Sequence, residues 1–161
     1  MASELDLIQR VYAYNSRVRG KYLNAIWRLP PRERYRDRGA SYPSIADIYL
    51  HVLDAYRLWF DEVYAHGPQP AWYPLGQRFS LAQARRETRA IDARVLGIVR
   101  GLTPRDLSRK FPLPKRWKAP RPITLQALLV HMIEEELQHR GEMNALLWQA
   151  GRNPPVTGFD E

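Results

Sequence analysis

The sequence of 161 residues contains no cysteine, and no apolar run in it approaches the roughly 20 residues that a membrane-spanning helix needs. The first absence excludes disulfides, thiolate metal ligands and a cysteine nucleophile. The second predicts a protein without a membrane anchor. The N-terminal residues also lack the basic and then apolar pattern of a secretory signal, so we predict a cytoplasmic protein.

Acidic side chains are in the minority. Lys and Arg number 25 against 17 for Asp and Glu, which gives a formal net charge of +8. Such an excess is typical of proteins that bind nucleic acid or anionic ligands. The basic residues are scattered along the chain, however, and do not cluster with aromatic residues. We therefore predict a solvated basic surface, with attraction of anions second and nucleic-acid binding disfavoured.

Strand-like alternation is almost absent, whereas four segments repeat apolar residues at steps of three and four, as amphipathic helices do. Ser44 and Ser80 each precede such a segment as N-caps, and Gly151 follows the last one as its C-terminal cap. A brief extended piece is expected within Phe111–Pro122. The pattern predicts an all-α, four-helix bundle in a single domain, residues 1–161, with long loops between the helices. The expected elements are helices at about residues 4–29, 44–65, 80–102 and 124–150, and a tail at 151–161.

The last helical segment carries two polar residues where its apolar face should continue. The face is apolar at both ends, but Glu135 and His139 occupy its middle, four residues apart. Residues at this spacing lie on one side of a helix, so both side chains are predicted to point into the bundle. An unpaired carboxylate there costs on the order of several kcal/mol, and a bound cation would offset this cost.

His51 supplies a third candidate ligand, since it lies midway along the core-facing side of the second segment. Facing helices of a bundle commonly hold metal ions in this way. Two imidazoles and one carboxylate suit Zn, Ni, Fe(II), Mn or Co. Three protein ligands leave coordination positions open, which is the arrangement of a catalytic site. The sequence thus predicts a divalent metal bound by His51, Glu135 and His139.

Other interpretations of the same residues stay open at this stage. A core histidine is often a hydrogen-bonded packing residue, and Glu135 could pair with Arg140 or with an arginine of another helix. His131 precedes Glu135 by four residues, so His51, His131 and Glu135 form a competing set of ligands. The Glu-x-x-x-His spacing is too common in helices to decide between them.

The segment from His131 to Met143 resembles the last-helix signature of the DinB/YfiT-like superfamily, His-x-x-x-His-x-x-His-His-Arg-Gly-Gln. The ending at residues 151–155 is similar to that family's Gly-x-x-Pro-Pro. Residues 48–55, together with Trp59, resemble its histidine-containing segment. The resemblance implies a four-helix bundle whose metal is held by three histidines, one from the second helix and two from the last.

The resemblance also implies a role for each matching residue. His51 matches the first ligand and His139 the third, while Glu135 stands where the family has its middle histidine. Gln138 replaces a further histidine that is not a ligand in the family pattern. His131 matches a frequent family histidine outside the three ligands, and we expect it to support the site from beside the ligands or to serve as an alternative ligand.

The family resemblance implies a metal-dependent enzyme that activates a thiol or water nucleophile: a thiol-dependent transferase or isomerase, or a hydrolase. A small-molecule substrate and a low-molecular-weight thiol as cosubstrate follow from that expectation. Asp54, one turn from His51, is a candidate for orienting a histidine or moving a proton, and an exposed helix residue is the alternative. The rival function is a non-catalytic, homodimeric binding protein with a structural or vestigial metal site, and a homodimer is predicted in either case.

Overall fold

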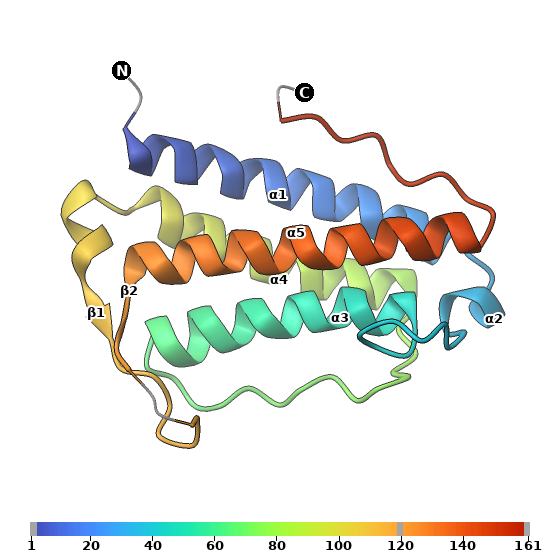
Figure 1. The fold of residues 1–161 in the computed structure, drawn as a ribbon, viewed down its shortest axis with the longest axis horizontal. Helices are drawn as coiled ribbons and strands as arrows, with labels where there is room; N and C mark the ends of the chain where they lie inside the picture. The colour runs from blue at the N-terminus through green and yellow to red at the C-terminus, as the bar shows by residue number, and fades with distance from the viewer. Residues whose placement is uncertain (1–2, 119–120, 160–161) are drawn as a thin grey trace.

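The computed structural model describes residues 3–118 and 121–159 and shows a bundle of four long helices (Figure 1). The helical elements, in chain order, are α1 (Glu4–Trp27), α2 (Pro31–Arg34), α3 (Ile45–Tyr56), a π-helical continuation of α3 (Arg57–Tyr64), α4 (Leu81–Arg100), a 3-10 turn (Pro104–Ser108) and α5 (Leu125–Gln149). Two short strands, β1 (Lys110–Phe111) and β2 (Ile123–Thr124), pair antiparallel just before α5. The predicted all-α fold is confirmed. Among the described residues, no helix is both long and apolar enough to cross a bilayer.

Three of the long helices begin with the same kind of cap. The hydroxyls of Ser3, Ser44 and Ser80 each accept a hydrogen bond from the backbone N–H three residues on, and the side chain there accepts one from the serine N–H. These capping boxes satisfy N–H groups that have no partner in the first turn. Gly151 follows α5 with φ +67°, the left-handed conformation of a helix C-terminus. The caps predicted at Ser44, Ser80 and Gly151 are confirmed.

The structure corrects the predicted helix bounds. The first helix ends at Trp27 and not at residue 29, because Pro30 has no N–H to donate and disfavours the helical conformation of Leu29, whose N–H donates to the carbonyl of Ile26 instead. The short helix α2 occupies part of the stretch that the sequence left irregular. In the second helix, the hydrogen bonding changes to the π-helical pattern at Arg57.

Two connecting segments also differ from prediction. The extended piece expected within 111–122 is a pair of strands that bracket this stretch, with Phe111 opposite Ile123; residues 119–120 lie outside the described residues. The tail after α5 runs back along α1, where Nζ of Lys21 donates to the carbonyl of Val156 at 3.1 Å. Its last two residues, 160–161, also lie outside them.

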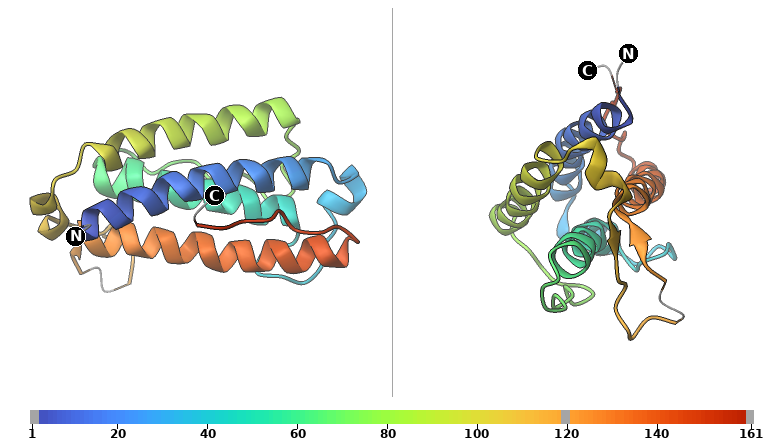
Figure 2. Two further views of the ribbon diagram at one scale, coloured as in Figure 1. Left: turned by 90° about the horizontal axis from the view of Figure 1, so that it is seen from above. Right: turned by 90° about the vertical axis from the view of Figure 1, so that its left-hand side faces the viewer.

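The four long helices do not alternate in direction. In Figure 1, α3 and α4 run one way, and α1 and α5 run the other. Around the bundle, α1 and α3 lie diagonally, each packed against both α4 and α5 (Figure 2). Because α3 and α4 are parallel, the chain between them must return along the length of the bundle. The loop of residues 65–80 does so beside α3 (Figure 1).

A cluster of buried charged groups joins all four helices. Glu136 of α5 is only 2% exposed. Its Oε2 accepts hydrogen bonds from Nη2 of Arg19 in α1 at 2.7 Å and from the hydroxyl of Tyr56 in α3 at 2.6 Å. Arg19 also forms an ion pair with Asp92 in α4. Around this cluster lies a core with large buried aromatic side chains: Tyr12, Tyr22, Tyr49, Tyr56, Phe60 and Phe111.

Replacing Arg19 with methionine removes the main counter-charge of Glu136 but keeps much of the side-chain volume. We expect Arg19→Met to lower the free energy of unfolding by about 3 kcal/mol, the lower part of the range for breaking a buried ion pair, because Arg140 still lies close to Glu136. Urea unfolding followed by circular dichroism measures the loss. The matched control, Arg89→Met on the exposed face of α4, should cost less than about 0.5 kcal/mol. Equal losses in the two variants would contradict the assignment.

Candidate metal centre

Helices α3 and α5 pack against each other and bring the three predicted ligands together. His51 lies in the middle of α3, and Glu135 and His139 lie one turn apart in α5. Oε1 of Glu135 is 2.9 Å from Nε2 of His51 and 3.2 Å from Nε2 of His139. One ligand atom from each residue lies within 4.8 Å of the other two. Two imidazole nitrogens and a carboxylate oxygen thus converge, and this group could hold a divalent metal ion.

This group is covered on one side and open on the other. The side chain of His139 is 4% exposed, against 16% for His51 and 21% for Glu135. The bundle therefore covers His139, whereas Glu135 and His51 are reached from solvent. Three protein donors with an open side leave room for a further ligand from solution.

Glu135 is less buried than the sequence predicts, and its neighbour Glu136 is the carboxylate that lies in the core. Nη2 of Arg140 lies 3.4 Å from Oε1 of Glu136, so the alternative in which Arg140 pairs with Glu135 is wrong. Consecutive residues of an α-helix are turned by about 100°. With Glu136 directed into the core, Glu135 is turned toward the edge between α3 and α5.

The second nitrogen of each imidazole has its own partner. The hydroxyl of Tyr42 lies 2.7 Å from Nδ1 of His51, and the two rings stack with centroids 4.3 Å apart. Nδ1 of His139 donates to Oε2 of Glu142 at 2.9 Å, and the hydroxyl of Ser41 donates to the same oxygen at 2.6 Å. Both Nε2 atoms are left on the side of the candidate centre. Partners of this kind fix the orientation and tautomer of metal-binding histidines.

Sequence reasoning did not assign these partners. Glu142 does carry a signal, because it follows His139 by three residues and so lies on the same side of the helix. Ser41 and Tyr42 carry no signal of this kind, although residues 39–44 are similar to the segment that precedes the second helix in the family. They belong to the segment before α3, and no spacing in the sequence tells that this segment folds over both imidazoles.

The hydrogen bonds within the group shift its acid–base equilibria. Hydrogen bonds from His139 and from His51 hold the pKa of Glu135 well below its usual range, against the opposing effect of burial. Burial lowers the pKa of His139, but its hydrogen bonds to Glu135 and Glu142 outweigh that effect, so this pKa is raised. At neutral pH Glu135 therefore carries a negative charge.

The two carboxylate partners of His139 leave a place for a cation beside its Nε2. A neutral imidazole has a single N–H. If Nδ1 of His139 gives it to Glu142, then Nε2 turns a lone pair toward Oε1 of Glu135, and the two atoms repel each other. A cation at this position, whether a proton or a divalent metal ion, removes the repulsion.

His131 does not join the group. Its ring packs edge-on against Trp59, with centroids 4.8 Å apart. Within the described part of the chain, the residues that could hold a metal together are His51, Glu135 and His139. The competing set with His131 is therefore not assembled in this structure, although the roles of the ligands stay a prediction.

Asp54 is buried, not exposed, and its carboxylate is hydrogen-bonded to groups outside the candidate centre. Its Oδ1 accepts from Nη1 of Arg57 at 2.8 Å and its Oδ2 accepts from the N–H of Tyr73 at 2.9 Å. Burial raises its pKa. Nδ1 of His51 contacts Tyr42 and not Asp54, so Asp54 does not orient this histidine by a hydrogen bond in this structure, and its role in moving a proton stays a prediction. Asp54 holds the loop between α3 and α4 against α3.

The fold and the His/Glu/His group together place the chain among helical-bundle proteins with a candidate metal centre between two helices. Comparison with known families narrows this class. A sequence profile described as the DinB family matches residues 1–160, and the chain belongs to this family. No curated protein matches the chain.

Two crystal structures show the same fold. A DinB-like protein from Bacillus cereus ATCC 10987 superposes with a TM-score of 0.73 at 16% identity, over 94% of this chain and 95% of that one. The DinB-like protein YjoA from Bacillus subtilis gives a TM-score of 0.63, also at 16% identity, over 91% of this chain and 95% of that one.

Two departures from the family signature add carboxylates to the centre. The signature that residues 131–142 resemble has a histidine at the middle ligand and a glutamine at its end, where this sequence has Glu135 and Glu142. The first supplies an anionic donor. The second accepts a hydrogen bond from His139 with a charged group, which strengthens that bond.

The metal-free protein offers a direct test of the Glu142 contact. Since hydrogen bonding to two carboxylates raises the pKa of His139, Glu142→Gln should lower it toward its usual value. The stability that this raised pKa provides is present at low pH and is lost as pH rises through it. NMR titration of the imidazole in the presence of a chelator measures the shift. Glu134→Gln, on the exposed face of the same helix, should leave it unchanged, and an unchanged pKa in Glu142→Gln would refute the contact.

Proposed function

We propose that His51, Glu135 and His139 bind one divalent metal ion, and that the protein is an enzyme that uses this ion to act on a small molecule. Zn, Ni, Fe(II), Mn and Co all suit two imidazole nitrogens and one carboxylate oxygen. The observation that carries the proposal is the convergence of these three donor atoms within 4.8 Å, from two packed helices.

The chemistry that such an ion supplies is a lowered pKa for a thiol or water that binds in its open position, which gives a nucleophile near neutral pH. The chain has no cysteine, so a thiol nucleophile would have to come from a small molecule. On the family resemblance, we propose a low-molecular-weight thiol as cosubstrate in a transferase or isomerase reaction. Hydrolysis requires no cosubstrate other than water and is the second reaction class.

The residues of the chain prepare the site for that chemistry. Tyr42 and Glu142 hold the two imidazoles by their Nδ1 atoms, so that both Nε2 atoms face the centre. Glu135 remains ionised because its pKa is low. The bundle shields His139 from water, and substrate approaches from the side on which Glu135 and His51 are exposed.

Metal analysis tests the proposal directly. Protein purified without chelator should carry close to one divalent ion per chain by plasma mass spectrometry. Glu135→Gln, His51→Ala and His139→Ala should each abolish tight binding in calorimetric titrations, because the histidine variants each remove a donor atom and Glu135→Gln replaces an anionic donor with a neutral amide. Tyr42→Phe keeps the stacked ring but loses the hydroxyl, and it should weaken binding by roughly 10–100-fold.

Two further variants serve as controls for this titration. Glu134→Gln removes an exposed carboxylate of the same helix and should leave the affinity unchanged. His131→Ala should reduce it only modestly. Tight binding that survives in His139→Ala but is lost in His131→Ala would overturn the ligand assignment, and a wild-type protein that binds no divalent ion would overturn the proposal.

A second candidate function is a homodimeric binding protein in which the metal only stabilises the fold. The observation that favours dimers is an apolar stripe on the outer side of α5. Val130, Leu137 and Trp148 are 49%, 52% and 62% exposed. They are separated by seven and eleven residues, close to two and three full helical turns, and so lie on one face. A second copy of the chain could cover this stripe.

A cytoplasmic location also stays a prediction.

A lysine in the stripe should break such a dimer. We expect the wild-type protein to sediment as a dimer at micromolar concentration, and Leu137→Lys to sediment as a monomer, because a charge in an apolar interface is costly to bury. Val156→Lys makes the same change at a residue of the tail that is 78% exposed, and it should remain dimeric. A wild-type monomer at micromolar concentration would contradict the prediction.

A further inference from the structure

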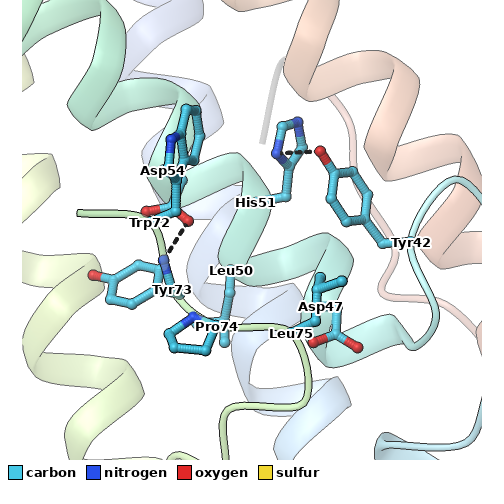
Figure 3. Close-up of a pocket in the computed structure, with 9 residues that line it drawn as sticks. All are labelled: Tyr42, Asp47, Leu50, His51, Asp54, Trp72, Tyr73, Pro74 and Leu75. Carbon is cyan, nitrogen blue, oxygen red and sulfur yellow. Dashed lines mark hydrogen bonds between the residues drawn. The ribbon is translucent and has the colours of Figure 1, made fainter. Parts of the chain in front are cut away.

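A hollow of about 330 Å³ lies between α3 and the loop that returns along it (Figure 3). Leu50 and His51 of α3 line it on one side, and residues 72–75 of the loop line it on the other. Tyr42 lines the end nearest to the candidate metal centre, where its hydroxyl contacts His51 (Figure 3). The volume is at the lower end of the range for small-molecule sites and suits one ring system.

The walls of this hollow are held in place. Oδ2 of Asp54 accepts the N–H of Tyr73 at 2.9 Å, and Oδ1 of Asp47 accepts the N–H of Gly76 at 2.6 Å. The guanidinium of Arg57 lies over the ring of Tyr73, 4.8 Å from its centroid. Two helix carboxylates therefore tie the loop to α3 at both ends of the stretch 73–76. The hollow persists between these ties and is not a gap beside a loose loop.

The chemistry of the lining favours a flat apolar ligand. Trp72 and Leu75 are 45% and 65% exposed, although both line a hollow in which a ligand could cover them. Aromatic and aliphatic walls of this kind recognise aromatic rings by stacking and by burial of apolar surface.

The charges of the lining disfavour anions, although Arg57 pairs with one of its two carboxylates, Asp54. Its ionisable groups other than His51 and the tyrosines are the carboxylates of Asp47 and Asp54, and no Lys or Arg is among the described residues that line it. A carboxylate ligand would lose its hydration next to these like charges. This local preference runs against the net charge of +8, which attracts anions to the molecule as a whole.

His51 connects the hollow to the metal centre. It is one of the residues that line the hollow, and its Nε2 faces Glu135. A ligand in the hollow is therefore in contact with a residue that would hold the metal. We propose that this hollow binds the aromatic, non-anionic part of the substrate and so places the rest of the substrate at the open side of the centre. That the ligand is a substrate rests on the proposed function, whereas binding of a ligand in the hollow needs no metal.

Three probes of nearly equal shape and different charge test the assignment: benzamide, benzamidine as its cation, and benzoate. Binding is followed by the backbone amide NMR signals of Tyr73 and Gly76, which flank the hollow and are present in every variant. Benzamide and benzamidine should bind, and benzoate should bind at least about tenfold more weakly. Trp72→Ala and Leu75→Ala should weaken benzamide binding by a similar factor, because each removes apolar contact area. Phe159→Ala truncates an aromatic residue of the tail with similar exposure, 41%, and should bind benzamide as the wild type does.

Three results would overturn the assignment: no binding of any probe, benzoate as the tightest probe, or benzamide binding that survives Trp72→Ala unchanged. Each titration is repeated after chelation and dialysis. If the wild-type protein binds benzamide but no divalent ion, the proposed function is contradicted and the hollow remains a binding site. A protein that binds metal tightly but none of the probes would remove the hollow alone.

Discussion

The ion pair between Arg19 and Glu136 sets the rotation of α5, and the candidate centre depends on it. A carboxylate in the core of a bundle needs a counter-charge, so Glu136 must face Arg19 of α1. One residue earlier, Glu135 is turned by about 100° and meets His51 of α3. The buried ion pair therefore orients the candidate metal ligands of α5, although neither Arg19 nor Glu136 belongs to the candidate centre.

The sequence predicts the helices and the pairing of His51 with α5 well, because both follow from periodicity, caps and a family signature. It predicts Glu135 as the buried carboxylate, whereas Glu136 lies deepest; residues 134–136 are three consecutive glutamates, so a small rotation of the helix decides which of them enters the core. Only the position of Arg19, more than a hundred residues away in the chain, decides between them. The contacts of Tyr42 with His51 and of Asp54 with the α3–α4 loop likewise depend on how loops pack, and loop packing has no periodic signal.

The direction of the helices links the centre to the hollow beside it. Parallel α3 and α4 oblige the chain to return along the bundle, and the returning loop is tied to α3 by carboxylates one turn on either side of His51. One helix thus presents His51 to α5 and shares it with the wall of an apolar hollow. The fold places a candidate metal centre and a candidate ring-binding site beside the same residue, His51.

Anomalous diffraction at the zinc absorption edge, from crystals grown with zinc, tests the central claim most directly. The account predicts one strong peak at about 2.0–2.2 Å from Nε2 of His51, Nε2 of His139 and a carboxylate oxygen of Glu135. A peak bound to His131 in place of His139, or no peak beside Glu135 at saturating zinc, would contradict it.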